Sequence, residues 1–263
     1  MRPFLLLLAF LLSLGPVLAI EDTTERMKPK APVKNFRLPR FGDNGYTQWV
    51  LRGAEGIYQS AERIDVKEMA LRIYSGDERM AVELSMDSPE AAILVQENRA
   101  VSDAPIQIIG ESFKISGIGW SWDGATRQIE VNSRSKVEFN QDLGDTLIEV
   151  GPSAAVGGEE TTIYSQRLSL RTSPDGYFFE FTDDVRVESG DMELTSQSLV
   201  TIADAPEGRG KSAKPEVPTA ESKLDSVRQI IAREDVMIRQ VDRVIYAGEA
   251  DFFPREESVH LSG

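Results

Sequence analysis

Period-two alternation of apolar side chains is the feature that most constrains the fold of this chain. Near its end, Val236 and Ile238 alternate with more polar neighbours, and the next run places Val244, Tyr246, Gly248, Ala250 and Phe252 on one parity. Neighbouring side chains of a β-strand point to opposite faces, so each run predicts a strand with one mostly apolar face. With Val259 and Leu261 beyond them, residues 230–263 predict three short strands joined by tight polar turns.

Similar runs recur through most of the chain, at intervals of roughly 8–12 residues, which is typical of an all-β sandwich, roll or solenoid. Turn signals separate them: Asn44-Gly45, Asp123-Gly124, Pro174-Asp175-Gly176 and Gly190-Asp191 each stand between two apolar runs. Residues 63–73 also fit a helical period; we expect a strand there.

Residues 1–19 resemble a signal peptide. Arg2 supplies the positive charge, an apolar run follows, and Val17-Leu18-Ala19 forms a small-residue cleavage site, so we expect export to the periplasm with cleavage after Ala19. The uncharged stretch of 17 residues from Phe4 to Ile20 is at the lower limit for crossing a bilayer. A retained anchor, with association at the inner membrane, is the alternative.

Charge and cysteine content exclude several classes of protein. The net charge of −14 leaves no face basic enough for nucleic acid or for an anionic membrane surface. No cysteine is present, which excludes a disulfide scaffold and zinc–thiolate sites.

The alternating runs fall into two halves of similar size. We expect a linker over residues 20–35, a first β module over 36–140, a second linker over 141–160 and a second module over 161–263. Within the second module, residues 204–223 are rich in Pro, Glu, Lys and Ser and predict a mobile loop. The residues on either side of that loop, 181–199 and 233–253, align with each other as an internal repeat.

The last strands also resemble a known family unit. The matching residues are Ile231-Ala232, Glu234-Asp235-Val236, Ile238, Ala247-Gly248-Glu249-Ala250, Phe252 and Leu261-Ser262-Gly263. They are similar to the repeat of the OstA-like family of periplasmic lipopolysaccharide-transport proteins, of the LptA and LptC type. Glu234-Asp235 replaces the Gly-Asn usual in that repeat, and Phe252 stands where Tyr is common. The aromatic strand, turn and Trp49-containing strand at the start of the first module resemble the opening of LptC-type domains.

The resemblance implies two tandem open, V-shaped β-rolls that hold lipid acyl chains in an apolar groove between antiparallel sheets. The implied ligand is lipopolysaccharide, through its lipid A moiety, and the implied partners are other Lpt-type β modules, stacked through edge strands. Choosing residues by their apolarity, we expect the groove to be lined by Trp49, Leu51, Trp120, Phe179, Phe181, Val185, Val187, Met192, Leu194, Val236, Ile238, Tyr246 and Phe252.

Catalytic readings find little support in the sequence. The single histidine, His260, has no cysteine to work with and lies in an expected strand, and the Asp183-Asp184 pair stands where a turn is expected. We therefore expect no enzyme, no resident metal and no cofactor. Two alternatives stay open: a structural or adhesive envelope protein with a closed core, and a carbohydrate-binding or hydrolytic β-solenoid.

Overall fold

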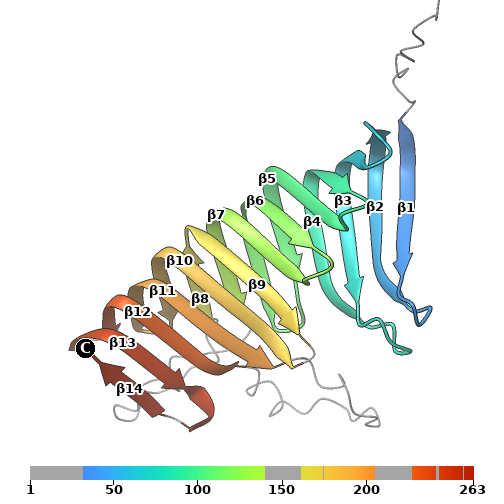
Figure 1. Cartoon of the computed structure of the whole chain (residues 1–263). Helices are drawn as coiled ribbons and strands as arrows, with labels where there is room; N and C mark the ends of the chain where they lie inside the picture. The colour runs from blue at the N-terminus through green and yellow to red at the C-terminus, as the bar shows by residue number, and fades with distance from the viewer. Residues whose placement is uncertain (1–31, 140–160, 174, 205–226, 241–242, 257) are drawn as a thin grey trace, which may run out of the picture.

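The protein is one antiparallel β-sheet of 14 strands (Figure 1). The computed structural model describes residues 32–139, 161–173, 175–204, 227–240, 243–256 and 258–263. The strands are β1 (Val33–Phe41), β2 (Thr47–Tyr58), β3 (Arg63–Tyr74), β4 (Val82–Leu94), β5 (Arg99–Ile109), β6 (Phe113–Asp123), β7 (Gln128–Phe139), β8 (Thr161–Ser165), β9 (Arg167–Ser173), β10 (Gly176–Ser189), β11 (Met192–Asp204), β12 (Val227–Gln240), β13 (Arg243–Phe253) and β14 (Ser258–Ser262). Within these ranges the only helical element is the 3-10 turn η2 (Pro254–Glu256).

Each strand pairs with the next along the chain, with one variation in the middle of the sheet. The short strands β8 and β9 follow each other in one row between β7 and β10, and both pair with both neighbours. The sheet therefore continues without interruption from the first predicted module into the second. The all-β expectation is confirmed, and the observed sheet is single.

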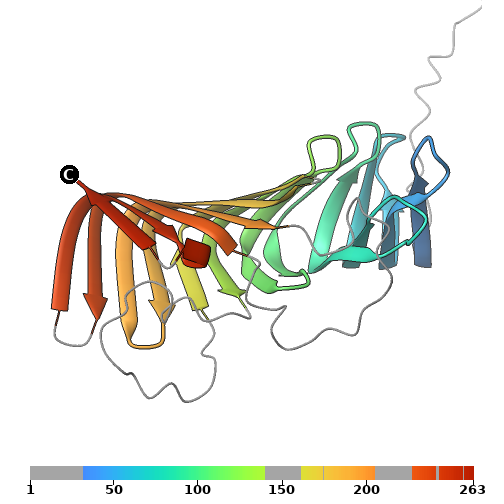
Figure 2. The same ribbon diagram turned by 90° about the horizontal axis from the view of Figure 1, so that it is seen from below.

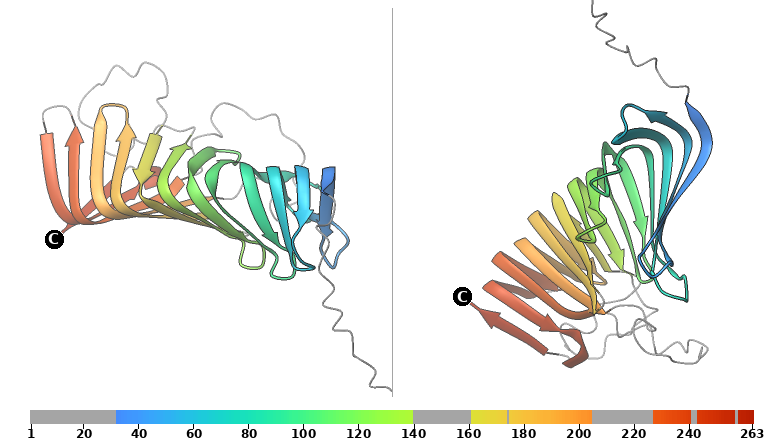
Figure 3. Two further views of the ribbon diagram at one scale, coloured as in Figure 1. Left: turned by 90° about the horizontal axis from the view of Figure 1, so that it is seen from above. Right: turned by 45° about the vertical axis from the view of Figure 1, so that its right-hand side comes forward.

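The long strands bend near their middles, so that each contributes to two walls of a V (Figures 2 and 3). We name as wall 1 the strand halves that end in the β3–β4 and β10–β11 turns, and as wall 2 the halves that end in the β4–β5 and β6–β7 turns. The line where the strands bend is the bend line, and the opposite side, where the turns lie, is the margin. Residues near the bend line with positive φ are Asn35, Glu68, Gly119, Arg134, Asp183, Asp184, Glu234 and Asp235.

Bulges within the strands produce the bend. In β10 the register with β11 shifts between Thr182 and Val185, and in β12 the register with β13 shifts between Arg233 and Val236. The inserted pairs, Asp183-Asp184 and Glu234-Asp235, are exposed and adopt φ values between 53° and 66°. Extra residues in one strand bend it and raise its local twist. The expected turn at Asp183-Asp184 is therefore a bulge inside one continuous strand.

Small side chains occupy the inner side of the bend line, because little space remains where the two walls meet. A Cβ atom on Gly117 would lie 2.3 Å from Cγ1 of Val131. Ser135 and Ser165 are buried, with their hydroxyl oxygens 2.5 Å apart, and the Ser165 hydroxyl also lies 2.7 Å from the carbonyl oxygen of Arg167. These hydroxyls satisfy polar groups that a bulge leaves outside the regular ladder.

A bulge also changes which side chains face the interior. In β13, Ile245 and Ala247 pack against the core, whereas beyond Gly248 the inward residues are Ala250 and Phe252. The single extra residue opposite the β12 bulge reverses the parity. The prediction that Val244, Tyr246, Gly248, Ala250 and Phe252 share one face is therefore wrong: the first three lie on the outer side.

The inner faces of both walls form one hydrophobic core that extends from Trp49 in β2 to Phe252 in β13. Aromatic side chains connect the walls near the centre of the sheet. Phe113 of wall 1 lies 5.1 Å from Tyr177 and 5.0 Å from Phe179 of wall 2, and Phe139 of wall 1 lies 5.3 Å from Phe179, all between ring centroids. Such edge-to-face pairs add to the stabilisation from burial alone.

Most of the predicted strands and turns are confirmed. Gly45 has a φ of 81° in the turn between β1 and β2, Gly190-Asp191 forms the two-residue turn between β10 and β11, and residues 63–73 form a strand, so their helical alternative is wrong. β1 begins at Val33, inside the segment predicted as linker. The predicted signal peptide, the linker over 141–160 and the loop after Asp204 lie outside the described residues. Among the described residues, no helix has the length and apolarity needed to cross a membrane.

Candidate functional site

Twelve of the thirteen residues expected to line a groove lie on the inner faces of the two walls and are at most 8% exposed. They are Trp49, Leu51, Trp120, Phe179, Phe181, Val185, Val187, Met192, Leu194, Val236, Ile238 and Phe252. The structure brings all twelve into the same continuous core. Tyr246 is 77% exposed and sits opposite Met237 on the outer face, so its assignment to the interior is wrong for the parity reason given above.

The space between the walls is filled by side chains in the central part of the sheet. Phe179 has no exposed surface and is surrounded by Phe113, Phe139, Tyr177 and Phe181. The inner face there is consequently a packed core in this conformation. Neither Phe113 nor Tyr177 was among the residues expected to line the groove, because alternation identifies a face without identifying its partner across the V.

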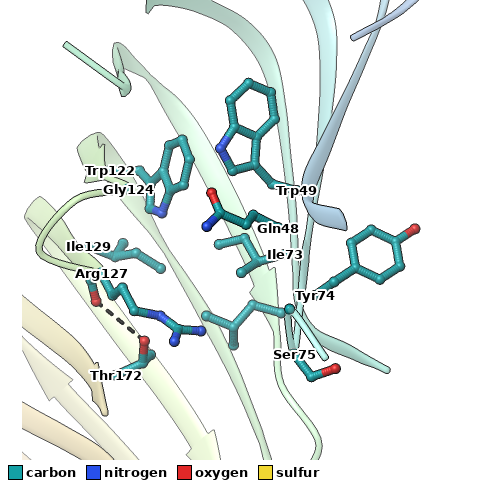
Figure 4. A pocket seen from close by; sticks show the side chains of 12 residues that line it. Gln48, Trp49, Ile73, Tyr74, Ser75, Trp122, Gly124, Arg127, Ile129 and Thr172 are labelled. Atoms are coloured by element: carbon teal, nitrogen blue, oxygen red, sulfur yellow. Dashed lines mark hydrogen bonds between the residues drawn. The ribbon is translucent and has the colours of Figure 1, made fainter. Parts of the chain in front are cut away.

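A pocket of about 230 Å³ opens between the walls at the margin of the amino-terminal half (Figure 4). Wall 1 contributes residues of β2, β3, the β3–β4 turn and β4; wall 2 contributes the end of β6, the following turn, β7 and Thr172 of β9. The lining residues are Gln48, Trp49, Ile73, Tyr74, Ser75, Gly76, Leu84, Trp122, Gly124, Arg127, Ile129 and Thr172. Its apolar lining includes Trp49 and Trp122, whose rings meet edge to face at 5.9 Å between centroids.

An ion pair connects the two walls beside this pocket. Arg127 Nη2 donates to Glu83 Oε2 at 3.0 Å; the Glu83 side chain is 7% exposed and that of Arg127 is 38% exposed. Among the ion pairs between described residues, this is the one that joins wall 1 to wall 2. The Arg127 backbone is held in turn by Thr172, whose backbone N–H donates to the Arg127 carbonyl at 3.1 Å. Sequence reasoning missed both charged residues, because they are 44 positions apart and no local pattern couples them.

A second, wider pocket of about 630 Å³ lies on wall 2, where β4 and β5 separate. Their pairing is interrupted between Asp87 and Ala92. Trp120 forms part of the lining, and its Nε1 donates to Ser88 Oγ at 3.2 Å, which fixes the indole beneath the gap. Burial of the ring with its N–H satisfied is the usual state of a core tryptophan.

Two carboxylates in the turns that border the margin pocket have lowered pKa values. Hydrogen bonds from the Arg79 and Ser75 side chains lower the pKa of Asp77 to about 2, and this carboxylate organises the β3–β4 turn at the edge of the margin pocket. Backbone N–H groups of Thr126 and Ala125 lower the pKa of Asp123 in the β6–β7 turn on the opposite side. Both turns that border the pocket are thus ordered by carboxylates.

The residues considered for catalysis do not assemble into a cluster in the described part of the chain. Asp183 pairs with Arg167 beside the bend line, with Arg167 Nε 2.8 Å from its Oδ2. His260 is exposed on β14, beside the Phe253 ring at 5.4 Å between centroids. Within the described ranges, no three His, Cys, Asp or Glu side chains are close enough together to hold a metal ion.

Comparisons with known proteins add no assignment: no family model matches the sequence, and no curated protein matches it.

Proposed function

We propose that this protein is a periplasmic carrier of lipopolysaccharide, which it binds by inserting acyl chains between the two walls of its bent sheet. The observation that carries the proposal is the single apolar interior, which extends from β2 to β13 through both halves of the chain. A carrier that moves acyl chains along its length needs such continuity. Each methylene transferred from water into this interior would contribute about 0.8 kcal/mol.

The bend geometry supports the resemblance to the OstA-like repeat. The family pattern has Gly-Asn where this chain has Glu234-Asp235, and both positions adopt positive φ here, at 64° and 55°. Glycine and asparagine are the residues that tolerate such values best. The same backbone state occurs at Asp183-Asp184, in the aligned segment of the internal repeat. The two segments therefore share a bulge as well as a sequence pattern.

In this proposal the two predicted modules act as one unit. Residues 36–140 and 161–263 would correspond to two OstA-like rolls fused through the pairing of β7 with β8 and β9. The outermost strands of the sheet are β1 and β14, and an outermost strand offers backbone N–H and C=O groups to another strand. Other Lpt-type β modules would pair there and extend the path for the lipid.

One observation favours the alternative of a structural envelope protein. Twelve of the expected groove residues are buried in a packed core, as they would be in a protein that never admits a lipid. The carrier proposal requires the walls to separate when acyl chains enter, and the alternative does not. The two functions therefore differ in whether lipid reaches Phe179.

Site-specific photo-crosslinking separates the two functions. A photoreactive phenylalanine analogue replaces Phe179, which is fully buried, and in a second variant replaces Glu180, which points outward from the same strand. The exported protein is irradiated in cells and probed for lipopolysaccharide adducts. Adducts at position 179 and none at 180 are the expected result. Absence of adducts at both positions would refute the carrier proposal and favour a closed structural core.

A further inference from the structure

The margin pocket combines two kinds of surface in one place. Trp49 and Trp122 provide an apolar side, while Gln48, Ser75 and Arg127 provide polar groups nearby. Figure 4 shows the Arg127 side chain extending from the β6–β7 turn toward the wall 1 side of the pocket. An apolar surface beside a fixed cation is complementary to a molecule with an alkyl chain and an anionic head group.

Arg127 is held in place by two hydrogen bonds, which leave several N–H donors of its guanidinium group unused by the part of the chain that the structure describes. Its carbonyl accepts from the Thr172 N–H at 3.1 Å, and its Nη2 donates to Glu83 Oε2 at 3.0 Å. A guanidinium group has five N–H donors, and among the described residues Arg127 directs one of them to a protein acceptor, Glu83. The nearly buried Glu83 carboxylate therefore orients the guanidinium, and the remaining donors are available to a phosphate or carboxylate at the margin.

We propose that the margin pocket is an access port for anionic amphiphiles: the alkyl chain lies against Trp49 and Trp122, and the anionic head group binds Arg127. Glu83 is a positioning residue that keeps its bond to Arg127 while the head group occupies the other donors. The inference rests on the proposed carrier function and specifies where a chain enters the space between the walls. The phosphate of a lipid and the carboxylate of a fatty acid share the required chemistry.

Tryptophan quenching by a brominated amphiphile tests the port directly. The chain contains three tryptophans, of which Trp49 and Trp122 line the pocket. The probes are 8-bromooctanoate and the uncharged 8-bromooctanol, titrated against the full exported protein. In the wild type, 8-bromooctanoate is expected to quench with a dissociation constant roughly tenfold below that of 8-bromooctanol. A single charge-assisted hydrogen bond contributes enough free energy for a difference of this size. Equal quenching by the two probes, or none by either, would overturn the proposal.

The decisive variant is the double substitution Glu83→Gln with Arg127→Gln. It removes the cation without leaving the Glu83 carboxylate buried beside a neutral partner, which limits the risk of misfolding. In this variant the dissociation constants of 8-bromooctanoate and 8-bromooctanol should become similar. Arg171→Gln is the control for loss of an arginine outside the pocket, because Arg171 stacks over the Phe178 ring on the same wall and does not line the pocket. Retention of the octanoate preference in the double variant would refute the role of Arg127.

Phe179 crosslinking in the same double variant distinguishes failure of the port from failure of the carrier function. Slower adduct formation at Phe179 in the variant supports the port. Unchanged adduct formation in the variant would leave lipid carriage intact and place the access point elsewhere. Octanoate-specific quenching without adducts at Phe179 would support the pocket as an amphiphile site and refute carriage through the interior.

Discussion

Replacement of Phe179 by alanine tests whether the sheet folds as one unit. Phe179 has no exposed surface and contacts the rings of Phe113, Phe139, Tyr177 and Phe181. Truncation of a buried phenylalanine costs about 3–5 kcal/mol, from lost burial and from the cavity that remains. With a urea m-value of about 3 kcal/mol/M, the unfolding midpoint should fall by roughly 1–2 M. Phe178, the neighbouring residue, is half-buried beneath the Arg171 guanidinium. Its truncation to alanine should lower the free energy of unfolding by only about 1 kcal/mol.

The position of the tryptophans turns this substitution into a test of coupling between the two halves. All three lie between residues 49 and 122, whereas Phe179 lies in the second half, so indole fluorescence monitors the half that is not mutated. If pairing across β7, β8 and β9 and the contacts of Phe113 and Phe139 with Phe179 couple the halves, the fluorescence and circular-dichroism transitions should move together. A fluorescence midpoint that stays at the wild-type value while circular dichroism shows an earlier step would refute the single unit and favour two independent modules.

Further substitutions test other parts of the structure. Tyr246→Ala should change the unfolding free energy by less than about 0.5 kcal/mol, whereas Phe252→Ala on the same strand should cost about 3–5 kcal/mol; comparable losses in urea titrations would contradict the parity reversal at β13. Ser135→Ala should cost about 1–2 kcal/mol by removing the bond to the Ser165 hydroxyl at the bend, and an unchanged thermal midpoint would argue against a structural role for this pair. Asp77→Asn should remove an acid-dependent stabilisation: the folded-state pKa of about 2 lies below the usual 3.8, so the stabilisation is present above pH 3.8 and is lost as the pH falls toward 2. The difference in urea midpoint between wild type and variant should therefore shrink between about pH 5 and pH 2, and a constant difference would count against the Asp77 bonds.

The strands and their turns could be predicted because both depend on local chemistry. Alternation identifies a strand from five or six residues, and pairs such as Asn44-Gly45 mark the turn that joins two of them. The helical alternative for residues 63–73 was a real ambiguity, because the same apolar residues satisfy both periods. It was resolved by pairing: β3 has β2 on one side and β4 on the other, and neighbours of this kind override local preference.

The bend was harder to predict, because a bulge is visible only as a break in parity. In β10, Phe181 and Val185 keep the same parity across the inserted Asp183-Asp184, so the inner face could be predicted there. In β13 one extra residue at Gly248 reverses the parity, and the apolar Val244 and Tyr246 imitate an inward run on the outer face. Apolarity alone does not distinguish these cases; the register with β12 does.

Contacts between the walls could not be predicted from any local pattern. Glu83 and Arg127 meet because β4 and the β6–β7 turn end at the same margin on opposite walls, a consequence of where three separate strands bend. Trp49 and Trp122 meet for the same reason, although only Trp49 was among the residues expected to face the interior. The margin pocket depends on both pairs, so its existence follows from the tertiary arrangement and leaves no signature in the sequence.

In the proposed function, an acyl chain must displace packed aromatic side chains. The free energy lost with those contacts can be compared with the free energy gained when the acyl chain is buried. An acyl chain that separates Phe113 from Phe179 forfeits an edge-to-face pair, at a cost of about 0.5–1.5 kcal/mol beyond burial, while each inserted methylene contributes about 0.8 kcal/mol. One or two methylenes therefore offset each aromatic pair that is lost. The remaining cost is that of moving the walls apart, and it is lowest if the movement is concentrated at the bend line, where the ladder is already interrupted at residues such as Asp184 and Asp235. A sheet that is hinged along a row of bulges can open at its margin while the pairing within each wall is retained.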